Sequence, residues 1–319
     1  MLSVRSDTTS RSRKWGRSSR SGAEDGRGDA HENEPRARAP DRTRTIHNVT
    51  RSTDWLEVGD RVFARRYAYL DQQIGVVLGQ AEALVIDTRA TPAHARELQA
   101  DIRRLTPDPV TVAVNTHWHW DHAFGNSVLR PAVIWGHERC RERLIRDGAD
   151  ARAEEAAADP AHRADFEAVV IDPPDRTLTI AADVEVGGRR VELRYLGRGH
   201  TDGDIVVAVP DADVLFAGDL LENGAIPWFG DGYPIDWPAT VERLLPLVGG
   251  AVVPGHGAAA DRAFVERQLE AFRLVASLAR QVHGGEIGRE AALASMPFDV
   301  ATSMEPLDRA LAQLRGELD

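Results

Sequence analysis

The sequence is short of three features, and each shortage excludes a class of protein. Cys140 is the only cysteine in 319 residues, which excludes an intramolecular disulfide and a cysteine-rich metal site. No apolar run approaches the roughly 18 residues that a membrane helix needs, so we expect no membrane partner. The basic segment around Lys14, the only lysine, is followed by no apolar region and is not an export signal. We therefore expect a reducing, cytoplasmic setting, with Cys140 in a packing or surface role.

Acidic residues outnumber basic ones, and the two signs are unevenly distributed. The formal net charge is −11, but residues 1–45 hold 11 basic and 7 acidic side chains, a surplus of 4 positive charges. Residues 46–319 therefore carry −15, which argues against a nucleic-acid partner, because nucleic-acid affinity comes largely from basic surface. Residues 1–45 are rich in Arg, Ser and Gly and poor in aliphatic side chains, so we expect a disordered tail. Composition leaves open whether this tail contacts RNA or a membrane or has no function.

One short segment contains most of the chemistry in this sequence. The stretch Thr-His-Trp-His-Trp-Asp-His follows directly on a β-branched run, residues 110–115, that predicts a buried strand. Imidazole nitrogen and carboxylate oxygen are ligands that divalent metals such as zinc prefer. In extended backbone, His117 and His119 project to the same side, whereas Asp121 and His122 need a tight turn to bring a second pair back. This layout suits two adjacent metals better than one.

Three further apolar strands each deliver one potential ligand close to a glycine. The candidates are His200 after residues 191–196, Asp219 after residues 214–218, and His256 after residues 251–255. Glycine allows close approach of the backbone at such positions. Because ligands from different strand ends can converge at one edge of a sheet, we expect these side chains to meet the histidine-rich segment.

The complete set resembles that of the metallo-β-lactamase superfamily, in order and spacing, across about residues 55–260. It matches that family's His-x-His-x-Asp-His motif, its later His, its bridging Asp and its final His. The resemblance implies one metal on His117, His119 and His200, a second on Asp121, His122 and His256, and Asp219 bridging both. Lactamases with a Cys ligand would carry Cys at the position of Asp219, and the other dizinc lactamase subgroup usually lacks this Asp. Both departures point towards glyoxalase II-like and SoxH-like hydrolases.

The resemblance implies an α/β fold, the four-layer αββα sandwich, over residues 46–319 including C-terminal helices. Hydrophobic patterns predict strands near residues 62–64, 75–78, 83–87, 110–115, 132–135, 190–196, 205–209, 214–218 and 251–253. They predict helices near residues 92–105, 138–168, 237–248, 261–283 and 304–315. Thr91 followed by proline is an N-cap signal for the first helix. Breaks are expected near Asp147-Gly148 and Asp159-Pro160.

Two divalent ions about 3.5–4 Å apart can hold a bridging water and lower its pKa towards neutrality. The resulting hydroxide would attack the carbonyl of a small ester, thioester or lactam-like substrate, while a metal stabilises the developing oxyanion. Asp121 is the candidate catalytic residue, because it could orient the hydroxide or carry a proton to the leaving group. The expected cofactors are two Zn²⁺, with Fe or Mn as alternatives.

The segment between Leu220 and Trp237 is long, glycine-rich and aromatic, and such loops often cover an active site. Five aromatic side chains could form an apolar pocket wall or could instead seal the core. They are Trp118, Trp120, Trp228, Phe229 and Tyr233.

Several polar residues are expected to support the ligands. Asp87 could accept a hydrogen bond from a ligand imidazole or could cap a turn. Thr201 is expected to orient the loop that carries His200, with Asp202 and Asp204 as structural partners. His137 is interpreted as a structural histidine, because the ligand count is complete without it.

Other functions stay open. A mononuclear iron persulfide dioxygenase shares the resembled fold, and so do some metal-dependent nucleases, although the acidic body disfavours the latter. A non-catalytic metal sensor fits less well, because a complete ligand set with an open bridging position is what catalysis needs. The expected partner is a small-molecule substrate. The sequence leaves the oligomeric state open, a dimer included.

Overall fold

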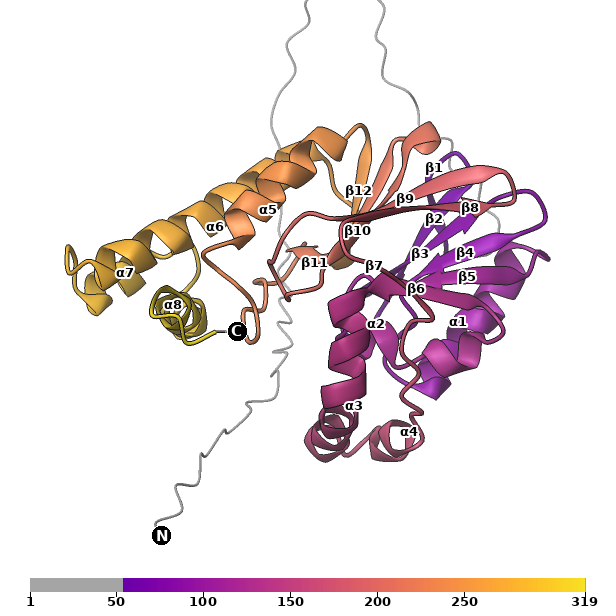
Figure 1. The fold of residues 1–319 in the computed structure, drawn as a ribbon, viewed down its shortest axis with the longest axis horizontal. Helices are drawn as coiled ribbons and strands as arrows, with labels where there is room; N and C mark the ends of the chain where they lie inside the picture. The colour runs from indigo at the N-terminus through magenta and orange to yellow at the C-terminus, as the bar shows by residue number, and fades with distance from the viewer. Residues whose placement is uncertain (1–53, 319) are drawn as a thin grey trace, which may run out of the picture. The chain divides into compact units, whose positions relative to one another are not determined.

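A mixed β-sheet of twelve strands folds over on itself to form the two inner layers of the molecule (Figure 1). This computed structural model describes residues 54–318, so the tail expected at residues 1–45 lies outside the described residues. The first half of the sheet consists of β1 (Leu56–Gly59), β2 (Val62–Tyr67), β3 (Gln72–Leu78), β4 (Ala83–Ile86), β5 (Val110–Val114), β6 (Val133–His137) and β7 (Arg176–Leu178). The second half consists of β8 (Ala181–Val186), β9 (Arg189–Tyr195), β10 (Ile205–Val209), β11 (Val214–Glu222) and β12 (Ala251–His256).

The strand order is β7-β6-β5-β4-β3-β12-β11-β10-β9-β8, with β2 and then β1 added beside β3. The halves join where Gln72 of β3 pairs with His256 of β12. Strands β4 to β7 run parallel, as do β11 and β12, and the remaining pairs are antiparallel. One apolar cluster, which includes Val77, Leu84, Leu193 and Phe216, fills the space between the two halves.

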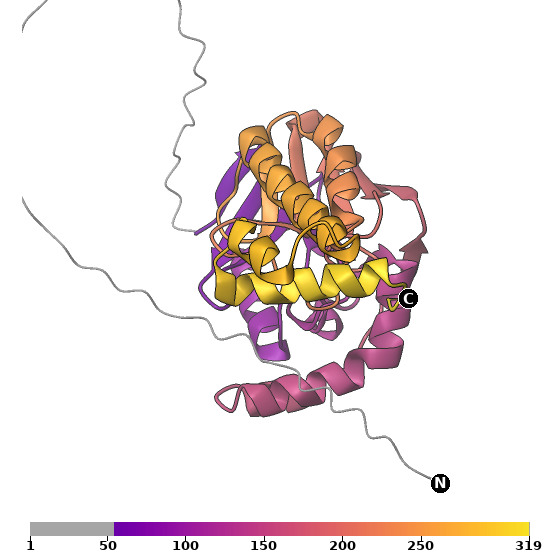
Figure 2. The ribbon, with the colours of Figure 1, turned by 90° about the vertical axis from the view of Figure 1, so that its left-hand side faces the viewer.

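Helices cover both outer faces. On the first half lie α1 (Pro92–Leu105), α2 (Trp120–Ala123), α3 (Glu138–Ala158) and α4 (Arg163–Glu167). On the second half lie α5 (Trp237–Leu244), α6 (Arg262–His283), α7 (Arg289–Ser295) and α8 (Val300–Leu314), and α8 crosses α6 (Figure 2). The layers are helix, sheet, sheet and helix, which confirms the expected αββα sandwich.

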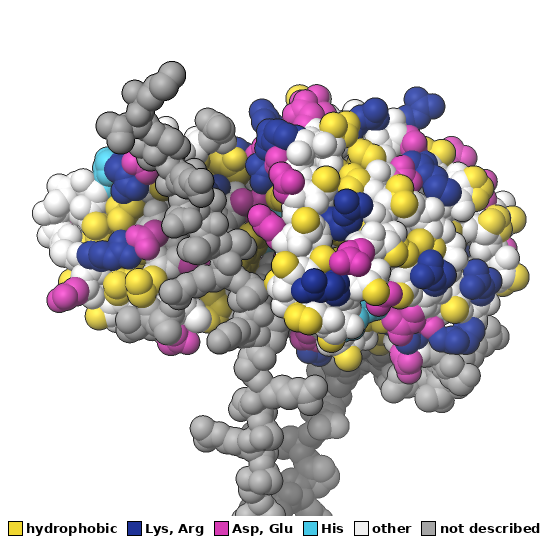
Figure 3. Space-filling view, turned by 90° about the horizontal axis from the view of Figure 1, so that it is seen from below, with side chains coloured by type: hydrophobic (Ala, Val, Ile, Leu, Met, Phe, Trp, Pro, Cys, Tyr) yellow, Lys and Arg dark blue, Asp and Glu magenta, His cyan; other side chains and the backbone are white. Residues whose placement is uncertain are grey.

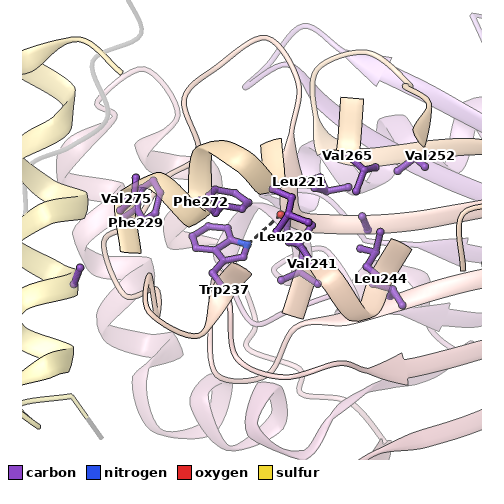
Figure 4. Packing of buried hydrophobic residues seen from close by; sticks show 14 of the residues in the cluster. Leu220, Leu221, Phe229, Trp237, Val241, Leu244, Val252, Val265, Phe272 and Val275 are labelled. Carbon is purple, nitrogen blue, oxygen red and sulfur yellow. Dashed lines mark hydrogen bonds between the residues drawn. The ribbon is translucent and has the colours of Figure 1, made fainter. Parts of the chain in front are cut away.

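Trp237, at the first position of α5, is the centre of the core beneath α5 and α6 (Figure 4). Its indole is fully buried, stacks on Phe272 with ring centroids 4.6 Å apart, and donates from Nε1 to the carbonyl of Leu220 at 3.1 Å. Burial of such aromatic area is among the largest single contributions to stability. It also fixes the strand that carries Asp219 against the helical layer.

Most predicted elements are confirmed, including the start of α1, where Thr91 Oγ accepts from the backbone N–H of His94 at 3.3 Å. The break predicted at Asp147-Gly148 is wrong, because α3 continues through Gly148, whose bare Cα face packs close to Ile171. Strands β1, β7 and β8 and helices α2 and α7 were not predicted. Among residues 54–318, no helix is both long enough and apolar enough to cross a bilayer.

Candidate metal centre

Three imidazoles meet at one edge of the sheet. Nε2 of His117 lies 3.0 Å from Nδ1 of His119, and Nε2 of His200 lies 2.8 Å from the same Nδ1. His117 and His119 follow β5, whereas His200 follows β9, and all three are buried. The three nitrogens therefore form a compact triangle within reach of a single cation.

A second cluster lies beside the first. Nε2 of His122 is 3.2 Å from Nε2 of His256, and Oδ2 of Asp121 is 3.4 Å and 3.2 Å from these two nitrogens. His256 ends β12, and Asp121 and His122 belong to the single turn of α2. The tight turn expected after His119 is this short helix, which begins directly after that residue.

Asp219 lies between the two clusters. Its Oδ2 is 3.4 Å from His200 Nε2 and 3.3 Å from His256 Nε2, and its Oδ1 is 3.3 Å from His122 Nε2. One carboxylate thus faces donor atoms of both groups. The structure therefore brings together all seven residues that the resemblance implied as ligands.

Two glycines make this approach possible. Gly218 has φ +53°, a conformation that L side chains rarely adopt, and the β11–β12 register is irregular at this residue. A side chain on Gly255 would place its Cβ 1.9 Å from Oδ1 of Asp219. Only glycine at residue 255 therefore leaves room for the Asp219 carboxylate.

The donor set fits divalent cations. Oδ2 of Asp121 and both oxygens of Asp219 are buried and have no hydrogen-bond partner among the described residues. Unpartnered buried polar atoms are costly, so they call for a ligand. Metal–nitrogen bonds of about 2.0–2.1 Å in a tetrahedral site place donors about 3.3 Å apart. The separations within the second cluster have this size.

The charges of the two carboxylates agree with this interpretation. Burial disfavours ionisation of Asp121 and Asp219, yet neighbouring imidazoles, those of His122 and His256 above all, hold the pKa of both carboxyls well below the usual range. Conversely, burial holds the pKa of His117 well below its usual value, with the nearby His122 adding to the effect. The centre thus offers ionised oxygen and at least one neutral nitrogen, which are the forms that bind metal.

Each imidazole of the two clusters also has its outer nitrogen engaged. Nδ1 of His122 donates to Asp87 at 2.8 Å, and Nδ1 of His117 contacts Thr116 Oγ1 at 3.1 Å. Asp87 in turn accepts from the backbone N–H of Thr116 at 2.8 Å. His256 Nδ1 donates to the carbonyl of Leu70 at 2.8 Å. Such outer partners fix the tautomer and aim the inner nitrogen. Asp87 thus accepts a hydrogen bond from one of these imidazoles, which is one of its two predicted roles.

The remaining two imidazoles are oriented by the loop that follows β11, residues 223–236. His200 Nδ1 donates to the carbonyl of Trp228 at 3.1 Å, and His119 Nε2 donates to Oδ1 of Asp231 at 3.1 Å. Asp231 also accepts from Trp118 Nε1 at 3.1 Å and from Arg143 at 3.0 Å. The loop therefore supports two imidazoles of the candidate metal centre.

Sequence reasoning missed Asp231 and Glu222 as site residues. Asp231 is separated from His119 by 112 positions, in a loop without hydrophobic periodicity. Glu222 ends β11, is 2% exposed, and forms a potential metal-binding group with His200 and Asp219. Its position three residues after Asp219 was the one available signal.

The five aromatic candidates separate into two groups. Trp228 is half-buried with its ring 5.2 Å from that of His119, and Trp118 packs under Arg143 beside Asp231. The other three lie elsewhere: Phe229 contacts Trp237 and Phe272 in the core, Trp120 packs on Phe166, and Tyr233 is buried beneath Arg198. Of the two alternatives for Phe229, a pocket wall or the core, the structure shows the core, because the residue is 1% exposed within the core cluster.

Hydrogen bonds between its own residues stabilise the loop that carries His200. Thr201 donates from Oγ1 and from its backbone N–H to Asp204, at 2.6 Å and 2.8 Å. His137 caps α3 by accepting from the backbone N–H of Arg139 at 3.2 Å, which is a structural contact. Cys140 is buried in the cluster beneath α3, and burial raises the pKa of its thiol, which keeps it unreactive.

Comparison with known proteins agrees with this geometry. A family model described as the metallo-beta-lactamase superfamily matches residues 70–256. The chain belongs to this superfamily. Metallo-beta-lactamase type 2 of Bacillus cereus is 27% identical over 205 residues, which cover 62% of this chain and 72% of that protein. The acyl-coenzyme A thioesterase MBLAC2 of Homo sapiens is 26% identical over 228 residues, which cover 62% of this chain and 79% of that protein.

A solved metallo-beta-lactamase from Pontibacter korlensis has the same superfamily fold, with a TM-score of 0.56 at 22% identity over 69% of this chain and 98% of that one. This likeness shows the fold. Superfamily membership and the buried His/Asp clusters together identify a metal-dependent hydrolase.

Proposed function

We propose that the protein is a dinuclear zinc hydrolase that cleaves a small acyl substrate, with thioesters preferred over esters and lactam-like compounds. The observation that carries this proposal is Asp219, whose oxygens face both donor clusters at 3.3–3.4 Å. Two divalent cations in such a centre would lower the pKa of water towards neutrality and polarise an acyl carbonyl.

The residues of the chain have separable tasks in this proposal. The first cluster, with His200, and the second, with His256, would hold one ion each, and Asp219 would bridge them. Asp121 lies in the second cluster with its Oδ2 free of hydrogen bonds among the described residues, so it can bind metal or carry a proton to the leaving group. Asp87 and Asp231 would keep the ligand imidazoles in their binding tautomer.

Substrate class rests on two supports. Asp219 stands where a lactamase with a Cys ligand carries that Cys. The donor set therefore has an additional oxygen ligand and resembles that of the glyoxalase II-like and SoxH-like subgroup. One relative, the human MBLAC2 protein, is named an acyl-coenzyme A thioesterase. We also propose a cytoplasmic location, where thioester substrates are available.

A second metal also separates this proposal from a mononuclear iron dioxygenase. The Asp121–His122–His256 group is as compact and as buried as the three-histidine group. A site that used one ion would leave these buried donors, including a carboxylate oxygen, without a cation, which is costly.

The test combines metal analysis with a substrate panel on the purified full chain. We expect two zinc ions per chain and faster hydrolysis of an acyl-coenzyme A or glutathione thioester than of a cephalosporin. Changing His117 and His119 together to Ala should remove metal and turnover, whereas His283→Ala, at an exposed position of α6, should change neither. A metal-free double variant with full activity would refute the proposal.

A further inference from the structure

Glu222 is a buried carboxylate that the seven-residue ligand set does not use. It is the last residue of β11, 2% exposed, and pairs across the sheet with His256 of β12. One of its carboxylate oxygens lies within 4.8 Å of a ring nitrogen of His200 and of a carboxylate oxygen of Asp219.

Hydrogen bonds hold both the backbone and the side chain of Glu222. The side-chain amide of Gln268, on α6, accepts from the backbone N–H of Glu222 at 3.1 Å and donates to its carbonyl at 2.8 Å. These are the two hydrogen bonds that the backbone of a paired strand would make. The backbone N–H of Trp228 donates to Glu222 Oε1 at 3.1 Å. A carboxylate has two oxygens and about four lone-pair positions, so it can accept from the Trp228 N–H and bind a cation at the same time.

The neighbourhood of Glu222 brings two carboxylates together in a buried space. Asp219 has both oxygens buried without a hydrogen-bond partner among the described residues, and Glu222 adds a second buried carboxylate beside it. Two adjacent buried carboxylates repel each other unless a cation lies between them.

We infer that Glu222 is an additional metal-binding carboxylate, which contacts the ion held on the His200 and Asp219 side of the centre. This rests on the proposed function only in that it requires the site to bind metal. The extra oxygen donor would make the centre richer in hard ligands, which favour Mn²⁺ and Fe²⁺ relative to zinc. Glu222 would thereby narrow the preference of the centre for zinc over Mn²⁺ and Fe²⁺.

A purely structural role is the competing explanation, because Glu222 also holds the loop through Trp228. Glu222→Gln separates the two roles: glutamine keeps an oxygen that accepts from the Trp228 N–H but removes the negative charge. Glu185→Gln is the matched control, since Glu185 is exposed on β8 at the edge of the sheet.

The measurement is the dissociation constant of Mn²⁺ and of Zn²⁺ for the full chain, by chelator competition, together with the visible spectrum of the Co²⁺ form. We expect Glu222→Gln to weaken Mn²⁺ binding by about tenfold or more, and zinc binding less, with an altered Co²⁺ spectrum and a nearly unchanged Tm. Glu185→Gln should match the wild type. Unchanged affinities and spectrum in Glu222→Gln would overturn the inference and leave a loop contact.

Turnover is measured separately. If the wild type binds two metals but hydrolyses no acyl substrate, the proposed function fails while a weakened Glu222→Gln still supports this inference. If the wild type hydrolyses thioesters and Glu222→Gln binds metal normally, the inference alone fails.

Discussion

Oδ1 of Asp231 lies 3.1 Å from Nε2 of His119, and this contact ties the loop after β11 to the histidine-rich motif. The Asp231 carboxylate also takes hydrogen bonds from Trp118 and Arg143, so it is held on three sides. Proximity to His119 and Arg143 outweighs burial and holds the pKa of Asp231 below its usual value. A candidate metal ligand and a distant loop are thus positioned by one ionised side chain.

Asp231→Asn tests that role. Asparagine keeps the shape but removes the charge, and its amide can no longer accept from His119, Trp118 and Arg143 together. Because partners of this kind typically contribute 10–100-fold to metal affinity, we expect a loss of about that size. Metal titration of the purified variant measures it. Asp211→Asn, at an exposed residue that pairs with Arg189, serves as control, and equal metal affinity in the two variants would count against the role.

The seven clustered residues could be predicted because each follows an apolar run or lies in a short local motif, although β11 continues past Asp219 to Glu222. Strand periodicity places His256 and Asp219, and the spacing of His117 and His119 gives their common direction. Family resemblance then supplied how these local segments meet, which no local pattern contains.

Asp231 and Glu222 could not be predicted by the same means. Asp231 acts through a loop whose conformation depends on Phe229 and Trp237 packing into the core, a tertiary contact without sequence period. The same limit explains Gly148, which reads as a helix break, although contact with Ile171 keeps it within α3. Tertiary packing overrides local propensity at such positions.

The mixed charge of the surface illustrates a further limit. Net charge correctly suggests an acidic body, but it says nothing of distribution. On the described part of the face in Figure 3, basic and acidic side chains are interspersed. Many arginines of the described residues are paired with acids, as Arg130 is with Asp172 and Asp175.

Trp228→Ala should change substrate affinity and leave metal content unchanged. The centroid of its ring lies 5.2 Å from that of His119 and 5.9 Å from that of His200. Its backbone carbonyl and N–H make the hydrogen bonds with His200 and Glu222, and alanine retains both groups. Loss of one apolar wall contact is about 1–3 kcal/mol, so KM should rise about tenfold or more. Steady-state kinetics with parallel metal analysis measure both quantities. Loss of metal in this variant would instead show that the ring supports the centre.

Phe229→Ala should have the opposite signature. Its buried ring contacts Trp237, Phe272 and Phe298, so truncation leaves a cavity and is expected to cost about 3–5 kcal/mol of the free energy of unfolding. Denaturant unfolding measures the loss, and KM of the folded fraction should stay near the wild-type value. Phe229→Leu fills most of the space and should lose less. A KM change without a stability change would return Phe229 to the pocket wall.

His94→Phe tests the acid sensitivity of the fold. Burial above all, with the nearby charges of Arg89 and His162, lowers the pKa of His94 from 6.5 to about 4. A histidine with a depressed pKa stabilises the folded state above pH 6.5, and this contribution is lost as the pH falls from 6.5 towards 4. Phenylalanine keeps the ring contact with Tyr69 but does not titrate. The fall in Tm between pH 7 and pH 4.5 should therefore be smaller in His94→Phe than in the wild type. Both proteins share every other titrating group, metal ligands included, so parallel Tm curves would show that His94 contributes nothing to acid unfolding.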